Sequence, residues 1–183
     1  MKGAKARGGG EPLPFFVEGG VMAAAVPVVE DATKYLNALR SLKDYDPPFE
    51  IMGNYRLIDD GEKPEATIIL KAKGRELHEA ATGVGPVDAL ANVLKKALTP
   101  LFPQLQGVRL LDFSSRIFDP RAGTEAKVEV RIIFGDGERL WEVHAFSENI
   151  NKASFWALVD GFEYAILLDQ GRGPFNSASE GRK

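Results

Sequence analysis

The 183-residue sequence contains no cysteine and only two histidines, His78 and His144. Without cysteine the chain forms neither disulfides nor thiolate zinc sites, and it has no cysteine nucleophile. Two histidines that lie far apart in the sequence cannot form a multi-histidine metal centre, and they offer few candidates for acid–base catalysis. Both fall in stretches predicted to be strands, where we expect solvent or interface contact rather than catalysis. The sequence therefore predicts no metal site and no cofactor.

The chain also lacks a basic excess and a long apolar run. Its 23 basic and 26 acidic residues give a net charge of -3, whereas a protein that neutralises nucleic-acid phosphates is usually basic. No stretch approaches the roughly 20 apolar residues of a membrane-spanning helix, and the longest, residues 21–29, is interrupted by Pro27. We therefore expect no nucleic-acid partner, no membrane partner and, with no cysteine, a cytoplasmic location.

What is present suggests one globular domain between two flexible ends. Hydrophobic residues make up 44% of the chain, which is an ordinary fraction for a soluble domain. Residues 1–27 are predicted to be a flexible Gly-rich leader, and residues 171–183 a flexible tail. Residues 28–47 are predicted to contain a short helix capped by Asp31, followed by a linker.

An internal repeat organises residues 48–170. Residues 56–67 (RLIDDGEKPEAT) and 116–127 (RIFDPRAGTEAK) align without a gap, and each is followed by alternating apolar residues that predict strands. Each copy ends in a helical pattern. The sequence therefore predicts an α+β fold, with a pseudo-twofold repeat of two βββα units, 49–101 and 108–168, that form a two-layer sheet/helix domain.

Several predicted strands carry apolar residues on both faces. Ile69, Ile133, Leu140 and Phe146 point away from the main apolar alternation, and strands that are apolar on both faces are usually covered on both. A second copy of the chain could provide that cover, so we expect a homodimer. Scattered surface apolar residues are the alternative, because such residues are common.

The segment GVGPVDA joins a predicted strand to the first long helix. It lacks the third glycine of a dinucleotide-binding loop and the Gly-Lys-Ser/Thr of a P-loop. We expect a tight structural turn formed by Gly83, Gly85, Pro86 and Asp88, with an anion facing the loop amides as the alternative.

Three polar residues lie near the start of the second long helix. Ser147, Asn149 and Ser154 could hold the carboxylate of a small zwitterion through hydroxyl and amide donors. Helix capping is the commoner use of such residues, and both interpretations stay open.

Three segments, GVGPVDALANVLKKAL, AGTEAKVEVRI and SENINKASFWALVDGFEYAIL, occur in an order and spacing that carry a family resemblance. Together they resemble the carboxy-terminal regulatory domain of the 2-isopropylmalate synthase and citramalate synthase family, over residues 48–168. The resemblance implies a dimer that binds a branched-chain amino acid, leucine or isoleucine, as a feedback effector near the dimer interface. It implies that the effector-associated loop contains Gly123, Thr124 and Ala126, with Leu111 and Phe113 on the preceding strand nearby.

The sequence has no counterpart of that family's catalytic part. A barrel of about 250 residues does not fit this length, and no His-x-His pair is present. We therefore expect a stand-alone regulatory domain that is not an enzyme by itself. The alternatives are a structural dimerisation module or a partner subunit of a separately encoded synthase, with effector binding lost. A small enzyme that uses His78 or His144 is a third and weaker hypothesis.

Overall fold

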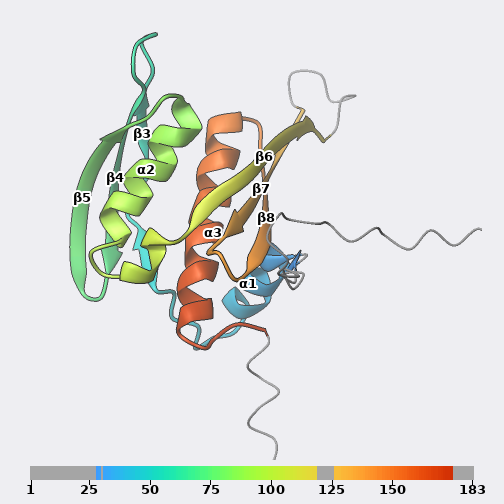
Figure 1. Ribbon diagram of the computed structural model, residues 1–183. Helices are drawn as coiled ribbons and strands as arrows, with labels where there is room; N and C mark the ends of the chain where they lie inside the picture. Colours follow the sequence, from blue (N-terminus) through green and yellow to red (C-terminus); the bar gives the residue numbers. More distant parts are fainter. Residues whose placement is uncertain (1–27, 30, 119–125, 175–183) are drawn as a thin grey trace, which may run out of the picture.

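The computed structural model describes residues 28–29, 31–118 and 126–174. The predicted leader, residues 1–27, and residues 175–183 of the predicted tail lie outside the described residues. The elements follow one another in this order (Figure 1): β1 (Val28–Val29), α1 (Ala32–Arg40), β2 (Phe49–Ile51), β3 (Arg56–Ile58), β4 (Glu65–Ala72), β5 (Arg75–Thr82), α2 (Pro86–Leu98), the 3-10 turn η1 (Pro103–Gln106), β6 (Arg109–Ile117), β7 (Val128–Gly135), β8 (Leu140–Ser147) and α3 (Ile150–Asp169).

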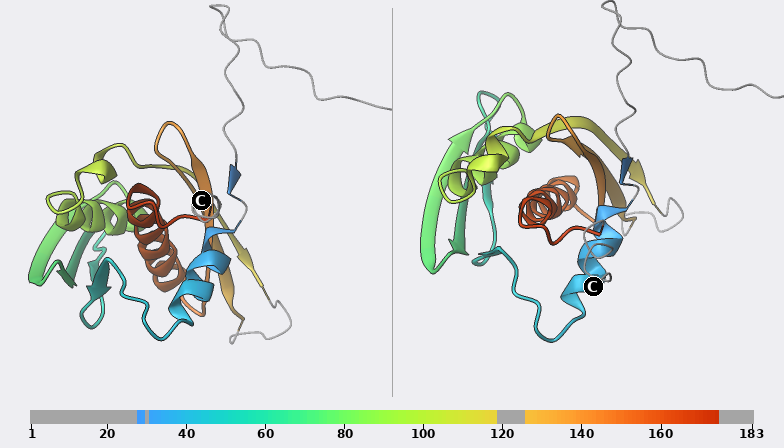
Figure 2. Two further views of the ribbon diagram at one scale, coloured as in Figure 1. Left: turned by 90° about the horizontal axis from the view of Figure 1, so that it is seen from below. Right: turned by 60° about the horizontal axis from the view of Figure 1, so that its bottom comes forward.

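These elements form two units of the predicted βββα type. In the first, β4 pairs with β5 on one side and with β2 and β3 on the other, and α2 packs on β4 and β5. In the second, the strand order is β1-β8-β7-β6, and α3 packs on β7 and β8. The helices α2 and α3 also pack on each other, and α3 lies between the two sheets (Figure 2). The predicted α+β fold with two βββα units is therefore confirmed.

The two units differ from the gapless alignment in one respect. Arg56 pairs with Thr67, while the aligned Arg116 pairs with Glu129 rather than with the aligned Lys127. The alignment is thus wrong by two residues across the first turn. Because side chains alternate with a period of two, this even shift keeps the same faces of the strands turned toward the core.

Both units have an irregularity in the first strand. In the first unit the strand is divided into β2 and β3, with Gly53 between them at a φ of 79°, a left-handed conformation that favours glycine. In the second unit β6 continues for nine residues but has a bulge between Leu110 and Asp112. The bulge changes the direction of the residue between them, Leu111.

Helix α3 forms the centre of the core. From Ala153 to Leu167 all of its residues except Trp156 are buried, because a sheet lies on each side of it. Gly161 allows the closest approach, since a Cβ atom at this position would lie 2.1 Å from Cε2 of Phe134. The indole N–H of Trp141 donates to the Gly161 carbonyl oxygen at 3.1 Å.

The amino-terminal helix α1 is attached to the second unit. It begins after Asp31, whose carboxylate accepts a hydrogen bond from the Lys34 N–H at 2.8 Å. Ala32 and Leu36 are buried, and α1 contacts both β8 and α3. Within the described residues, no helix is both long and apolar enough to cross a membrane.

Candidate functional site

Of the effector residues implied by the family resemblance, the structure describes Leu111, Phe113 and Ala126. Gly123 and Thr124 lie outside the described residues. Ala126 is half-buried just before β7. Leu111 and Phe113 are both on β6 but face opposite sides of the sheet. Phe113 packs on the core, whereas Leu111 is 54% exposed and lies over Gly135.

The polar residues at the start of α3 serve as caps. The Asn149 side-chain oxygen accepts hydrogen bonds from the N–H groups of Asn151 (2.8 Å) and Lys152 (3.1 Å). The Ser147 hydroxyl oxygen accepts from the Asn149 N–H at 3.2 Å. Ser154 is fully buried, and its hydroxyl has no partner among the described residues. The capping interpretation thus accounts for Asn149 and Ser147, and Ser154 has no path to solvent.

The GVGP segment forms a turn whose geometry requires close packing. A Cβ atom at Gly83 would lie 2.2 Å from the amide nitrogen of Ala89, so only glycine lets the strand end approach α2 so closely. Gly85 is the N-cap residue and Pro86 the first residue of α2. The Asp88 carboxylate accepts from the Val84 N–H at 2.9 Å. The Val84 N–H is therefore hydrogen-bonded to a side chain within the turn itself.

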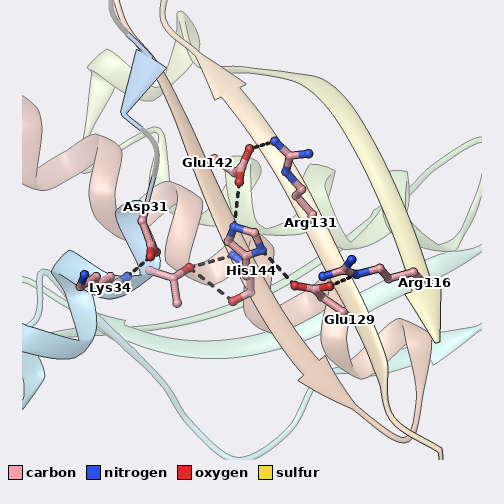
Figure 3. Close-up of polar contacts among 8 residues, drawn as sticks. Asp31, Lys34, Arg116, Glu129, Arg131, Glu142 and His144 are labelled. Carbon is pink, nitrogen blue, oxygen red and sulfur yellow. Dashed lines mark hydrogen bonds and ion pairs between the residues drawn. The ribbon is translucent and has the colours of Figure 1, made fainter. Parts of the chain in front are cut away.

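The two histidines have different surroundings. His78 is exposed on β5, opposite Ile69 of β4. His144 lies between two carboxylates on the outer face of the second sheet (Figure 3): its Nε2 is 2.7 Å from Glu142 and its Nδ1 is 3.3 Å from Glu129. In the described part of the chain, neither imidazole ring is hydrogen-bonded to a serine, threonine or tyrosine hydroxyl.

The carboxylates beside His144 are also paired with arginines. Glu129 accepts a hydrogen bond from Arg116, and Glu142 accepts one from Arg131. The side-chain hydrogen bond from Arg116 is the largest influence on the pKa of Glu129, which lies below its usual value although burial opposes the shift. His144, its two carboxylates and their two arginines form a polar ladder across β6, β7 and β8, which neither the repeat nor any motif predicted.

The polar ladder lines a pocket of about 280 Å³. The carboxylates of the ladder are almost fully buried and already paired with arginines. The Thr33 hydroxyl accepts a hydrogen bond from the backbone N–H of His144 at 2.8 Å. The ladder therefore has the character of a structural network within the second sheet, and the Thr33 hydroxyl attaches α1 to β8 through the backbone of His144. Among the described residues, no group of three or more histidine, aspartate or glutamate side chains is arranged to hold a metal ion.

A second charged cluster joins α1 to the middle of α3. One Arg40 nitrogen lies 2.7 Å from Asp160 and 2.5 Å from Glu163, and the Tyr45 hydroxyl donates to Glu163. Burial raises the pKa of Asp160, although Arg40 opposes the shift. Burial and the hydrogen bond to Glu163 also raise the pKa of Tyr45. The signal in the sequence was the pair of acidic residues, Asp160 and Glu163, in the largely apolar middle of the helix.

A pocket of about 400 Å³ lies at the other end of β6, where it meets the β7–β8 hairpin. Leu111 is part of its lining. Leu111 is therefore a candidate effector residue that lines a pocket. The sequence could not predict this, because the bulge that turns Leu111 to this face is not marked by a glycine or proline.

Comparison with known proteins gives a consistent set of matches. Residues 35–166 match the family described as the LeuA allosteric (dimerisation) domain. The (R)-citramalate synthase of Geobacter sulfurreducens is 41% identical over 133 residues, which cover 69% of this chain and 25% of that protein. The corresponding enzyme of Aquifex aeolicus is 36% identical over 140 residues, covering 76% of this chain and 26% of that protein. The chain thus spans about a quarter of the length of these relatives.

Proposed function

Because the chain belongs to the LeuA allosteric (dimerisation) domain family, we propose that it is a regulatory module of citramalate synthase type. In this proposal residues 48–170 dimerise and bind leucine or isoleucine as a feedback effector, and α1 and its linker are attached to them. The match over residues 35–166 carries the proposal.

Exposed apolar side chains at one end of the second sheet support self-association. Ile117, Phe118 and Phe146 are 61%, 58% and 51% exposed, and the two phenylalanine rings meet edge to face at 5.1 Å. Three large apolar side chains at one sheet end favour contact with another protein surface. A second copy of the chain is the occupant that the family description favours.

Effector binding would act by shifting an equilibrium between two states of the dimer. A ligand does this only if it binds one state more tightly than the other. Phe113 and Ala126 lie on the described part of the strand and loop region that the resemblance implicates, and both are only partly buried. A partner chain could complete a site around them.

Calorimetry on the full chain with leucine, isoleucine and valine tests the sensing role. We expect heat with leucine or isoleucine at up to millimolar concentration, and a change in the dimer dissociation constant measured by sedimentation. The absence of heat with all three amino acids would contradict amino-acid sensing.

A structural role is the second candidate, and the cap geometry favours it. The Asn149 and Ser147 side-chain oxygens, offered as effector contacts, already accept hydrogen bonds from backbone N–H groups. In that case the chain would dimerise and bind a separately encoded synthase barrel, and amino acids would have no effect on either association. Purification of the tagged chain with that enzyme, unaffected by amino acids, is the expected result.

A further inference from the structure

The 400 Å³ pocket beside the β7–β8 hairpin has the size of a small-molecule site, since such sites occupy about 300–1,000 Å³. It lies on the outer face of the second sheet, away from Phe113, which packs on the core. It also lies at the end of β6 opposite to Ile117. Neither Phe113 nor Ala126, the other described residues that the family resemblance implicates, is part of its lining.

The floor of this pocket is apolar because of a bulge and a glycine. The bulge in β6 places Leu111 beside Leu140, the first residue of β8, which pairs with Gly135 of β7. A Cβ atom on Gly135 would lie 2.7 Å from Leu111 Cδ1 and 2.8 Å from Leu140 Cδ2. The absence of a side chain at Gly135 thus lets both leucines lie over the backbone and form one apolar surface. Bulges commonly redirect a side chain next to a functional site.

The rim of the pocket has an unmatched positive charge. Arg139 is paired with Asp136, whose carboxylate also accepts hydrogen bonds from the N–H groups of Glu138 and Arg139. Although burial raises the pKa of Asp136, these bonds lower it overall, so this carboxylate stays ionised and fully engaged. The Arg109 guanidinium, in contrast, has no hydrogen-bond or ion-pair partner among the described residues.

A second cation lies close to Arg109. The Lys95 ammonium donates to the carbonyl oxygens of Val108 (2.8 Å) and Gln106 (3.2 Å). Burial and the nearby charge of Arg109 lower its pKa. The two like charges repel each other, and an anion at the Arg109 guanidinium would relieve this repulsion. The pocket thus combines an apolar floor with a rim that favours one negative charge.

We propose that this pocket binds a small carboxylate with a branched aliphatic chain. The carboxylate accepts hydrogen bonds from the Arg109 guanidinium, and the aliphatic chain packs on Leu111 and Leu140. The inference rests on the proposed function only in that leucine belongs to this class. Because Asp136 is fully engaged, the lining offers no free carboxylate for an ammonium group. The pocket therefore recognises 4-methylpentanoate as well as leucine.

Titration of the full chain with 4-methylpentanoate and with leucine, followed by calorimetry and by amide NMR, tests this site. We expect both ligands to bind with dissociation constants within about threefold of each other, with shifts of the Gly135 and Leu140 amides. Arg109→Met should weaken binding by about tenfold or more, as expected for the loss of a charge-assisted hydrogen bond. Arg75→Met is the matched control, because Arg75 is likewise exposed and begins strand β5, and it should leave binding unchanged.

Gly135→Ala is a second variant that acts on the floor. The clash involves only the ends of two flexible leucine side chains, so the fold should persist while the displaced leucines narrow the pocket. We expect at least about fivefold weaker binding for 4-methylpentanoate, as for the loss of one well-packed apolar contact. An unchanged circular-dichroism spectrum would show that the variant is folded.

The outcomes separate this inference from the proposed function. If leucine binds and Arg109→Met changes nothing, the effector site is elsewhere and the pocket assignment is overturned. If both ligands bind through Arg109 but leave the dimer equilibrium unchanged, the pocket assignment is supported and a role of this pocket in feedback regulation is contradicted. If 4-methylpentanoate does not bind at millimolar concentration while leucine does, recognition requires the ammonium group and the assignment is overturned.

Discussion

At the scale of single residues, Gly161 shows how one missing side chain fixes the packing of two elements. A Cβ atom there would lie 2.1 and 2.4 Å from two ring atoms of Phe134. That ring is buried, stacked on Trp141 at 5.9 Å and in contact with Phe162, so it has little room to move. The contact between α3 and β7 therefore depends on glycine.

Gly161→Ala should destabilise the fold. Alanine is the better helix former by about 1 kcal/mol, but overpacking a closed core costs about 1–3 kcal/mol, and the immobile ring favours the upper part of that range. We expect a net loss of at least about 1 kcal/mol in the free energy of unfolding, measured with urea. Gly107→Ala is the control, because its Cβ would meet no atom closer than 3.7 Å. Equal stabilities of the two variants would contradict this account.

Asp160 should make stability depend on pH in a direction opposite to that of most carboxylates. Its pKa is raised above the ordinary 3.8 by burial, against the effect of Arg40, so the folded state binds this proton more tightly than the unfolded state does. The resulting stabilisation is present at pH values below 3.8 and is lost as the pH rises through the folded pKa. The free energy of unfolding of the wild type minus that of Asp160→Asn should therefore decrease as the pH rises from about 3.8. An increase over that range would show that the pairing with Arg40 dominates.

At the scale of elements, the segment that contains α1 and its linker contributes few fully buried residues to the core. Ala32 and Leu36 are its buried apolar residues, and Arg40 neutralises two carboxylates of α3 with one guanidinium. Such a segment belongs to the low-stability part of a fold and can open without global unfolding.

Arg40→Met should therefore loosen α1 selectively. It leaves Asp160 and Glu163 buried without a cation, which costs several kcal/mol for a fully buried pair, but the 36% exposure of the Arg40 side chain reduces this to about 1–2 kcal/mol. We expect amide hydrogen exchange in residues 32–40 to accelerate by about tenfold, while exchange in α2 stays unchanged.

Two further variants make this test specific. Lys34→Met removes an exposed cation from the same helix and should leave exchange unchanged. Adding Asp160→Asn and Glu163→Gln to Arg40→Met removes the unpaired charges and should recover part of the protection. If Lys34→Met and Arg40→Met have equal effects, helix propensity rather than the buried cluster would control α1.

The elements themselves were largely predictable from the sequence. Period-two alternation identified the inward faces of β4 and β7, where Ile68, Leu70, Val130 and Ile132 are buried. What the pattern could not predict was the burial of α3 on nearly all sides, because the second covering layer is a sheet from the other half of the chain. Ile150 is 42% exposed, since it lies in the first turn, before the part of α3 that is buried on nearly all sides.

The candidate site was less predictable than the fold, for a related reason. The family resemblance implied Leu111 and Phe113 together, and alternate residues of a regular strand would share one face. The bulge between Leu110 and Asp112 separates them, and bulges of this kind carry no obligatory residue type. The contacts of Arg40 with Asp160 and Glu163 join residues more than one hundred positions apart, and no local pattern reports such pairs.

At the scale of the whole molecule, the described core is complete within one chain, while the end of the second sheet is not covered. The sheets and helices pack around one core, and its large side chains, such as Trp141 and Phe155, are fully buried. Ile117, Phe118 and Phe146 lie outside this core. Self-association through these side chains would therefore not be needed for folding, and its loss should leave a folded monomer.

Phe118→Glu and Phe146→Glu, singly and together, test this separation. Each change places a carboxylate in an interface that excludes water, so we expect the dimer dissociation constant to rise by about tenfold or more, as for the loss of an aromatic interface anchor. Sedimentation equilibrium measures the constant, and thermal unfolding of the monomer should shift by less than about 2 °C, because surface substitutions usually change stability by under about 0.5 kcal/mol. Leu42→Glu is the matched control, since Leu42 is 59% exposed but lies in the linker after α1. If the double variant still dimerises like the wild type, the second copy must bind a different face, and β6, the edge strand of the second sheet, is then the surface to substitute next.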